Sequence, residues 1–367
     1  MTRVALVHER FTEFGGSEAV VGEFVETWPD AEVFAPIVAP GGIREPVGAV
    51  HDSWLSRAHA LTGGRHAPLL PLVPRVLRRL PLRDHDVVVI SHHAFATQAA
   101  LATDAPVVAY VHSPARWAWD REFRAQEAGG RAGQLALAAL GTLARRGELR
   151  AAPRLAHVVA NSHAVAQRVT DWWGLPASVV NPPVQVARFT PDPALAREDF
   201  YLCAGRLVPY KRADLAIRAA QRAGVRLVVL GEGRFRAQLA AIAGPETTFL
   251  GATSAAQLQD MYRRCRALLM PGIEDFGIVP VEAMACGAPV LAVGAGGALD
   301  TVRPGVVGAY VPAGTDDEVV AALAELMGEF DSATYDPAKI RDHALTFAPE
   351  VFRARMAGVV DDVLAGR

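Results

Sequence analysis

Short apolar runs alternate with loops and helical segments along the whole chain. In the first half these runs cover residues 4–7, 87–90, 107–111 and 157–160, and they are rich in valine. Runs of this kind, bounded by polar or turn residues, are typical of parallel strands that are buried on both faces. The first run is followed by a glycine-containing loop and by helical spacing over residues 17–28. The pattern therefore predicts strand–loop–helix units of a parallel α/β sheet.

A proline-rich segment divides this pattern into two halves. Four prolines lie between residues 182 and 193, which excludes a regular helix or a central strand there. Apolar runs then resume at residues 200–204, 227–230, 248–250, 267–270 and 290–293, and residues 351–364 have the pattern of an amphipathic helix. We therefore expect an α/β fold of two Rossmann-like, doubly wound domains, residues 1–183 and 184–349, that face a cleft. A cleft between domains commonly binds a polar ligand.

Length, charge and cysteine content narrow the class of protein. A chain of 367 residues is expected to form two domains, and its formal net charge of −2 disfavours a nucleic-acid partner. The three cysteines form no Cys-x-x-Cys pair, which argues against a zinc knuckle or a disulfide framework and favours a reducing cytoplasm. No apolar stretch suits a signal peptide or a membrane span, so we expect a cytoplasmic protein.

The segment 271–290 has the clearest local signals. Pro280 suits the first position of a helix and Gly287 suits the position after its end, which predicts a short helix over residues 280–286. The N-terminus of a helix attracts anionic or hydroxyl oxygens because its amides have no partner inside the helix. Three amides are expected to be offered in this way: those of Phe276, Gly277 and Ile278.

Two carboxylates flank that helix start. Glu274 lies in the preceding loop and Glu282 in the expected first turn, so both can face one crevice and accept hydrogen bonds from sugar hydroxyls. An acid in a first turn also gains about 0.3–1 kcal/mol from the helix dipole alone. For Glu282 the structural explanation therefore stays open, whereas Glu274 gains nothing from capping this helix.

A basic loop follows the expected strand at residues 200–204. Arg206 can form two hydrogen bonds to phosphate oxygens, and Lys211 supplies a compact charge close by, so the pair resembles a clamp for a diphosphate. Gly205 allows a close approach of the backbone. Loop arginines and lysines are more often simply solvated, which is our expectation for Arg212 and Arg222.

In the first half, two loops at the carboxyl ends of strands carry candidate residues. Gly15 and Gly16 would let backbone amides approach an anion, although a helix entry capped by Ser17 explains the same residues. His112 follows a buried strand and could bond a sugar hydroxyl or a leaving group. A loop histidine with a structural partner is about equally expected.

Other signals are weaker. Gly231-Glu-Gly233 lacks the third glycine and the later acid of a nicotinamide-binding fingerprint, and Asp84-His-Asp86 lies at the amino end of a strand, where a turn is expected. His92-His93 has no further ligands at zinc spacing and is expected to be a polar loop.

A basic, apolar segment covers residues 69–83 and carries four arginines: Arg75, Arg78, Arg79 and Arg83. It could contact an anionic membrane surface. We favour a surface helix with solvated arginines.

Several of these motifs together resemble those of retaining nucleotide-sugar glycosyltransferases of family 4, which have two Rossmann-like domains in the GT-B arrangement. The resemblance is greatest to bacterial mannosyltransferases that build O-antigen and exopolysaccharide. It rests on the order and spacing of these segments: 7–18, 110–120, 160–162, 182–184, 205–212, 274–282 and 296–300. Asp300 stands where such proteins usually have Glu, and Gln185 stands where Asp is common.

The resemblance implies a role for each matching residue. Glu274 would contact hydroxyls of the donor sugar, Glu282 the nucleotide ribose, Arg206 and Lys211 the diphosphate, and His112 the sugar. It also implies that a C-terminal helix over about residues 350–367 packs back on the first domain. The catalytic candidates are Arg206, Lys211, Glu274 and His112. The donor-binding candidates are Gly15, Gly16, Gly205, Gly231, Gly251, Thr253, Phe276, Gly277, Ile278 and Glu282.

The expected function is transfer of a hexosyl group, with GDP-mannose as the expected donor, to a hydroxyl of a glycan, lipid-linked or small-molecule acceptor. The resemblance implies retention at the anomeric carbon, and neither a metal nor a cofactor is expected. A nucleotide-sugar 2-epimerase and a non-catalytic binding protein with the same cleft are the alternatives.

Overall fold

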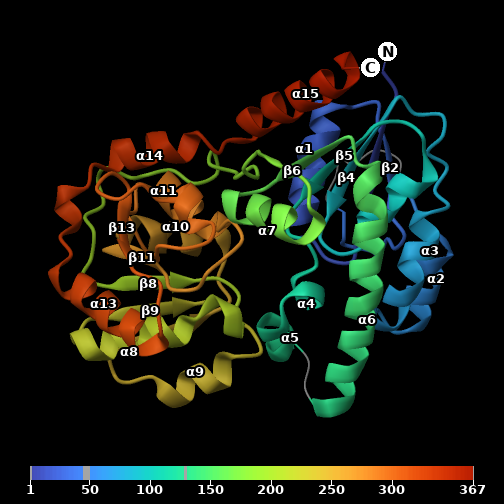
Figure 1. The fold of residues 1–367 in the computed structure, drawn as a ribbon. Coiled ribbons are helices and arrows are strands. Elements are labelled where there is room, and N and C mark those ends of the chain that lie inside the picture. The colour runs from blue at the N-terminus through green and yellow to red at the C-terminus, as the bar shows by residue number, and fades with distance from the viewer. Residues whose placement is uncertain (1, 44–49, 128–129, 367) are drawn as a thin grey trace. The chain divides into compact units, whose positions relative to one another are not determined.

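The computed structural model describes residues 2–43, 50–127 and 130–366. The chain forms two compact units. Unit 1 runs up to Pro183 and resumes at Pro349, and unit 2 is Val184–Ala348. Both units are layered α/β structures with helices on either face of one sheet (Figure 1). The boundary falls in the proline-rich segment because prolines cannot continue either sheet.

Unit 1 contains a parallel seven-stranded sheet in the order β3-β2-β1-β4-β5-β6-β7. Its central strands are buried along their whole length because helices cover both faces. The strands are β1 (Val4–His8), β2 (Glu32–Phe34), β3 (Val50–His51), β4 (Val87–His92), β5 (Val107–Val111), β6 (His157–Ala160) and β7 (Ser178–Val179).

The helices of unit 1 cover the two faces of this sheet. Alternate strand residues pack on α1 and α15 on one face and on α2, α3 and α6 on the other. The α-helices are α1 (Gly16–Thr27), α2 (Trp54–Leu61), α3 (Val73–Leu77), α4 (Arg116–Trp119), α5 (Arg121–Glu127), α6 (Gly130–Ala151), α7 (His163–Trp173) and α15 (Pro349–Ala365). Short 3-10 helices are η1 (Ala67–Leu72), η2 (Ala96–Ala102) and η3 (Ala152–Arg154).

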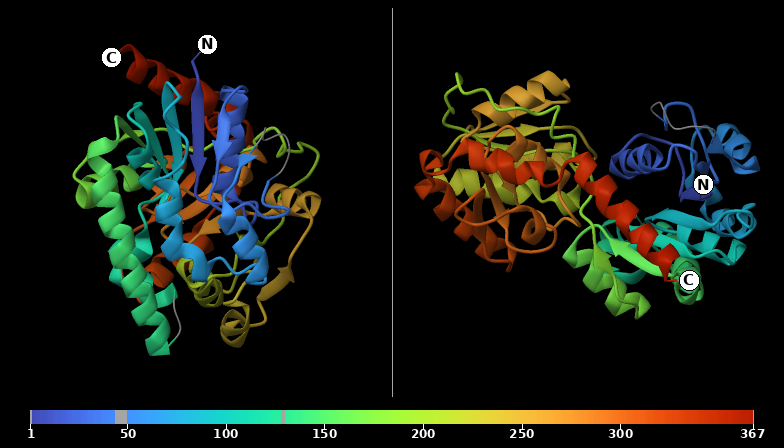
Figure 2. Two further views of the ribbon diagram at one scale, coloured as in Figure 1. Left: turned by 90° about the vertical axis from the view of Figure 1, so that its right-hand side faces the viewer. Right: turned by 90° about the horizontal axis from the view of Figure 1, so that it is seen from above.

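The last helix, α15, belongs to unit 1 although it follows unit 2 in the chain. It lies against α1 (Figure 2). The Phe352 ring stacks on the Phe24 ring with centroids 5.5 Å apart, and Arg353 forms an ion pair with Glu23. Burial of Phe352, Met356 and Val360 explains why residues 351–364 have an amphipathic pattern. Arg367, at the end of the expected helix, lies outside the described residues.

Unit 2 contains a parallel six-stranded sheet in the order β10-β9-β8-β11-β12-β13. The strands are β8 (Tyr201–Ala204), β9 (Leu227–Leu230), β10 (Thr247–Gly251), β11 (Ala267–Met270), β12 (Val290–Val293) and β13 (Gly308–Val311). The helices are α8 (Ala213–Ala223), α9 (Arg236–Ile242), α10 (Ala255–Arg264), α11 (Ile278–Ala285), α12 (Ala298–Thr301), α13 (Asp316–Glu329) and α14 (Pro337–Leu345), with η4 (Pro209–Lys211) and η5 (Ser332–Thr334) as 3-10 turns.

The fold class predicted from the sequence is confirmed: both units are parallel-sheet α/β structures. Each of the predicted strands is present. Their ends differ by at most one residue, except that β4 runs two residues past its predicted end, to His92. Among the described residues, no helix combines the length and the apolar character needed to cross a bilayer.

Candidate functional site

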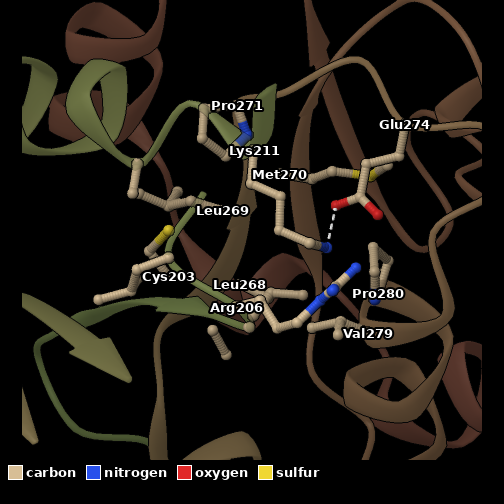
Figure 3. Close-up of a pocket in the computed structure, with 14 residues that line it drawn as sticks. Cys203, Arg206, Lys211, Leu268, Leu269, Met270, Pro271, Glu274, Val279 and Pro280 are labelled. Carbon is tan, nitrogen blue, oxygen red and sulfur yellow. Dashed lines mark hydrogen bonds and ion pairs between the residues drawn. The ribbon is translucent and has the colours of Figure 1, made fainter. Parts of the chain in front are cut away.

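The loops after β8 and β11 form a pocket in unit 2. From β8 the sheet continues through β9 and β10 on one side and through β11, β12 and β13 on the other, so β8 and β11 mark a topological switch point. Open α/β sheets bind ligands at such points, at their carboxyl edge. Side chains from both loops and from the start of α11 line the pocket (Figure 3). The lining includes three of the four residues expected to be catalytic: Arg206, Lys211 and Glu274.

Lys211 and Glu274 are paired in this pocket. The Lys211 Nζ atom lies 2.9 Å from Glu274 Oε1, and both side chains are mostly buried. The bond uses one of three ammonium N–H donors and one of two carboxylate oxygens. The ammonium is therefore held in place while donors remain for a phosphate, and the second carboxylate oxygen remains for a hydroxyl.

Arg206 is exposed at the mouth of the same pocket, beside Lys211 (Figure 3). Its Nη2 donates a long hydrogen bond of 3.5 Å to the Tyr210 hydroxyl. Two cations and one carboxylate give this lining a net positive charge. This charge and the forked guanidinium of Arg206 suit a diphosphate ligand.

The predicted glycines shape the loops after three adjacent strands. Gly205, Gly231 and Gly251 all have positive φ values, of 134°, 131° and 69°. The Gly231 N–H donates to Gly251 O at 2.9 Å, and a Cβ on Gly231 would lie only 1.9 Å from Gly205 O. Glycine is therefore required there for the loops to stack. Thr253, which follows β10, is half-buried.

Helix α11 begins earlier than predicted. It starts at Ile278, so Pro280 occupies its third position instead of its first. Proline is tolerated there because the first amides of a helix have no acceptor inside it. Gly277 caps the start with φ at 96°, and a Cβ on it would lie 2.8 Å from Met270 Cε. Within the described chain, the amides of Gly277 and Ile278 have no hydrogen-bond acceptor.

Phe276 contributes differently from its neighbours. Its side chain is buried and its ring packs edge-on to Phe347, with centroids 5.6 Å apart. Only the backbone of Phe276 is thus available to a ligand.

Glu282 lies in the second turn of α11, so the dipole explanation raised for it is wrong. Its Oε2 accepts a hydrogen bond of 3.1 Å from the hydroxyl of the fully buried Tyr262. Burial raises the pKa of Glu282 to about 7, and the Tyr262 bond and the charges of Arg188 and Lys211 oppose that rise only in part. Burial also raises the pKa of Tyr262 well above its usual range.

Sequence reasoning missed the glycines that hold the acidic loop. The Gly297 N–H donates to Glu274 O at 2.9 Å, and a Cβ on Gly297 would lie 2.3 Å from the Phe276 backbone. On the other side, a Cβ on Gly272 would lie 2.6 Å from Tyr210 O. Both glycines lie in the loops that follow β11 and β12, at the carboxyl edge of the sheet, and that position was the signal available in the sequence.

Arg212 was expected to be solvated, but the structure pairs it with two carboxylates. It is half-buried, and it is paired with Asp214 and with Asp316, 3.0 and 2.6 Å away. It also has a positive φ, of 55°, the only such value outside glycine among the described residues. Arg212 therefore anchors the turn that follows Lys211.

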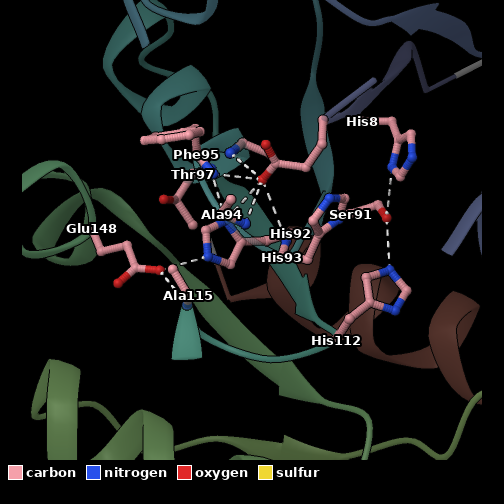
Figure 4. A network of polar contacts seen from close by, with 12 residues as sticks. His8, Ser91, His92, His93, Ala94, Phe95, Thr97, His112, Ala115 and Glu148 are labelled. Carbon is pink, nitrogen blue, oxygen red and sulfur yellow. Dashed lines mark hydrogen bonds and ion pairs between the residues drawn. The ribbon is translucent and has the colours of Figure 1, made fainter. Parts of the chain in front are cut away.

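In unit 1, His112 lies just after β5 and bonds to the end of β4. Its Nε2 is 2.8 Å from the hydroxyl of Ser91, whose other neighbour is His8 Nδ1 at 3.0 Å (Figure 4). The pKa of His112 is lowered to about 3, mainly by burial and to a smaller extent by His8 when it is protonated, while Glu18 partly opposes the shift. His112 is therefore neutral at physiological pH.

In the expected glycine loop of unit 1, one of the two glycine amides is already hydrogen-bonded within the protein. The Gly15 N–H donates to Glu18 Oε2 at 3.0 Å, and Ser17 donates to the same oxygen instead of capping the helix. Gly15, not Ser17, is the N-cap residue of α1. Gly16 is exposed as the first residue of the helix, so of the two predicted glycines it is the one open to an anion.

His92 and His93 were expected to form a polar loop, but His92 is the last residue of β4 and has a specific side-chain partner. His92 is fully buried and lies 3.0 Å from Glu148, while Glu9 Oε1 accepts four backbone N–H bonds from residues 93–96 (Figure 4). Within the part of the chain that is described, no group of three or more His, Cys, Asp or Glu side chains could hold a metal ion. The segment 84–86 forms a turn, as expected.

The four arginines of the 69–83 segment separate into two kinds. Arg75, Arg79 and Arg83 are exposed. Arg78 instead turns inward and donates to Gln98 Oε1 at 2.8 Å, and burial lowers the pKa of its guanidinium. Membrane contact through the exposed three stays a prediction.

Comparison with known families decides the class. Residues 14–188 match the model described as Glycosyltransferase Family 4, and residues 190–334 match the model for glycosyl transferases group 1. The two models follow one another along most of the chain, one on each unit. The chain belongs to glycosyltransferase family 4. This family assignment confirms the resemblance expected from the motifs at that level.

Individual relatives carry glycosyltransferase names, and solved structures share the fold. The chain is 35% identical over 209 residues to a D-inositol 3-phosphate glycosyltransferase of Mycolicibacterium gilvum, covering 51% of this chain and 45% of that protein. The chain thus spans about half the length of the curated relatives it matches. Among solved structures, the family 4 chain resembles Anabaena HepE in complex with UDP (TM-score 0.67, 19% identity, 98% of this chain and 100% of the other). It also resembles a sucrose-phosphate synthase of Thermosynechococcus elongatus (TM-score 0.71, 17% identity, 100% of both chains).

Proposed function

We propose that this family 4 protein transfers a hexosyl group from a nucleotide-diphosphate sugar to a hydroxyl acceptor, with retention at the anomeric carbon and without a metal ion. GDP-mannose is the proposed donor. The observation that carries the proposal is the unit 2 pocket, where Lys211 and Arg206 lie beside the carboxylate of Glu274 and the start of α11 completes the lining. The amides of Gly277 and Ile278 at that helix start have no acceptor within the described chain. Cations and amides suit a diphosphate, and the carboxylate suits a sugar hydroxyl.

In this proposal catalysis is mainly electrostatic. The bond between the anomeric carbon and the phosphate oxygen breaks, the acceptor oxygen bonds to that carbon on the same face, and the departing phosphate oxygen takes the acceptor proton. Arg206, Lys211 and the amides of α11 stabilise the negative charge that grows on the diphosphate. Glu274 orients the sugar, Glu282 bonds the ribose, and no side chain acts as a nucleophile.

The relatives suggest what to test first as donor and acceptor. The curated relative is named for D-inositol 3-phosphate, so phosphorylated cyclitols are the first small-molecule acceptors to offer. The HepE structure contains UDP, so uridine nucleotides belong in the donor panel beside guanosine nucleotides. The loop at Gly251 and Thr253 is the proposed site of base selection.

A melting screen followed by a product assay tests the proposal. GDP, UDP, ADP and dTDP are each added to the protein, and a ligand present at 100 times its Kd stabilises the folded state by about 2.7 kcal/mol. We expect GDP to raise the melting temperature most, and GDP-mannose with an acceptor to yield a glycoside and GDP. A changed sugar nucleotide formed without acceptor would replace this proposal with an epimerase, and donor binding without any product would replace it with a binding protein.

A further inference from the structure

A chain of buried hydrogen bonds connects His112 to the interior of unit 1. Glu18 Oε1 lies 3.2 Å from His8 Nε2, and Ser91 Oγ lies between His8 Nδ1 and His112 Nε2 (Figure 4). His8 and Ser91 are fully buried. His112 is only partly buried, and its second ring nitrogen, Nδ1, points away from Ser91 (Figure 4).

The sheet topology brings these side chains together. The strands β1, β4 and β5 are adjacent, and His8 is the register partner of Ser91, which in turn pairs with Tyr110 two residues before His112. The His112 N–H donates to His92 O at 2.9 Å, which extends the ladder past the last strand residue. The Tyr110 ring packs edge-on to the His112 ring with centroids 5.2 Å apart. The imidazole is thus held by backbone and by neighbouring rings as well as by Ser91.

The chemistry of these groups decides which atom donates in each hydrogen bond of this series. A carboxylate only accepts hydrogen bonds, so His8 must donate from Nε2 to Glu18. Burial alone would raise the pKa of Glu18. His8, through its hydrogen bond and through its charge when it is protonated, outweighs that effect together with hydrogen bonds from the backbone of Glu18 and from Ser17, and the pKa is lowered. A neutral His8 then has no proton on Nδ1 and accepts the only proton of Ser91. The Ser91 oxygen in turn accepts from His112 Nε2.

We propose that His8 and Ser91 are positioning residues for His112: with His8 neutral, they keep the His112 proton on Nε2 and leave Nδ1 as an acceptor for a hydroxyl of the transferred sugar. The identity of that ligand rests on the proposed function, whereas the tautomer does not. A histidine with one fixed tautomer accepts from a hydroxyl without having to reorganise. Its low pKa keeps the ring neutral.

The tautomer is measured directly by nitrogen-15 NMR of the histidine rings at pH 8.5. The His112 signals are assigned by their loss in His112→Gln. We expect protonated Nε2 and unprotonated Nδ1 in the wild-type protein, a mixture of both tautomers in Ser91→Ala, and recovery of the single tautomer in Ser91→Thr. A wild-type His112 protonated on Nδ1 would overturn the proposal, and so would an unchanged tautomer in Ser91→Ala. If Ser91→Ala does not fold, the wild-type spectrum still decides.

A matched control exists in the same sheet. His157 Nε2 lies 2.8 Å from the hydroxyl of Ser178, the same contact as in the proposed chain, but between β6 and β7. Ser178→Ala is expected to change the His157 signals and to leave the His112 signals and the ligand affinity as they are. A change at His112 in this variant would show that the effect of Ser91→Ala is not specific.

Affinity measurements separate positioning from general damage. We expect Ser91→Ala to weaken GDP-mannose binding about three- to tenfold, the free energy of about one hydrogen bond. GDP binding should stay unchanged, because GDP lacks the transferred sugar whose hydroxyl would meet His112. Equal losses for both ligands, or no loss for either, would contradict the proposal. If the wild-type protein binds no nucleotide sugar at all, the proposed function fails, while the NMR result still decides the tautomer.

Discussion

The first prediction concerns Glu282, a half-buried acid that accepts a hydrogen bond from the fully buried Tyr262. Replacing it by Gln removes the ionisable group but keeps an oxygen that can accept from Tyr262, 3.1 Å away. A pKa of about 7 in the folded protein, against 4.5 for the ordinary side chain, corresponds to about 3 kcal/mol. This is the free energy by which folding disfavours the ionised form.

The direction of the pH effect on stability follows from which protonation state of Glu282 the folded protein prefers. The pKa of Glu282 is raised on folding, so its contribution is fully present below about pH 4.5 and is lost as the pH rises through about 7. The wild-type protein should therefore lose about 2–3 kcal/mol from this group between pH 5 and pH 8. Glu282→Gln has no such loss, so its stability relative to wild type should rise by about that amount over the same range.

Urea unfolding of both proteins at pH 5 and pH 8 measures this difference. Glu325→Gln serves as the control because Glu325 is exposed on α13 of the same unit. It should change stability by less than about 0.5 kcal/mol at either pH. If Glu282→Gln and wild type differ by the same amount at both pH values, the ionisation argument for this site is refuted.

Two further predictions concern the unit 2 pocket. Arg206→Ala should lower the rate of transfer about 10²- to 10³-fold, the usual cost of removing one preorganised donor, and steady-state kinetics with near-normal turnover would remove Arg206 from the proposed site. Gly297→Ala should lower stability by about 1–3 kcal/mol and weaken nucleotide binding, because its Cβ would lie 2.3 Å from the Phe276 backbone that precedes α11. Gly328→Ala is the matched control, since a Cβ there meets nothing within 4 Å on the exposed side of α13, and calorimetry should show no loss of stability.

The fold could be predicted from the sequence because most strands are buried on both faces and are therefore continuous apolar runs. Strands without such a run were missed: β2, β3, β7 and β13 are two to four residues long. The long helix α6 was also missed because it contains glycines that serve packing. A Cβ on Gly141 would lie 3.2 Å from the Ala118 backbone, and one on Gly147 would lie 2.8 Å from Gln98.

The sequence predicts those parts of the candidate site that depend on where residues stand relative to the nearest strand. Arg206, Lys211 and Glu274 share a pocket because each follows the carboxyl end of a strand, which the pattern already indicates. The roles of Ser91 and Tyr262 depend on long-range contacts, with His8 83 residues away and Glu282 20 residues away. Strand order and helix packing decide such contacts, and a single sequence shows neither.

The central claim is that cations and amides of unit 2, in place of a metal ion, support hexosyl transfer from a nucleotide sugar. It is tested most directly by measuring glycoside and nucleoside diphosphate formation from GDP-mannose in excess chelator, for the wild-type protein and for Lys211→Ala. We predict an unchanged wild-type rate in chelator and a loss of about 10²- to 10³-fold in the variant. An absolute requirement for a divalent metal, or normal turnover by Lys211→Ala, would contradict the claim.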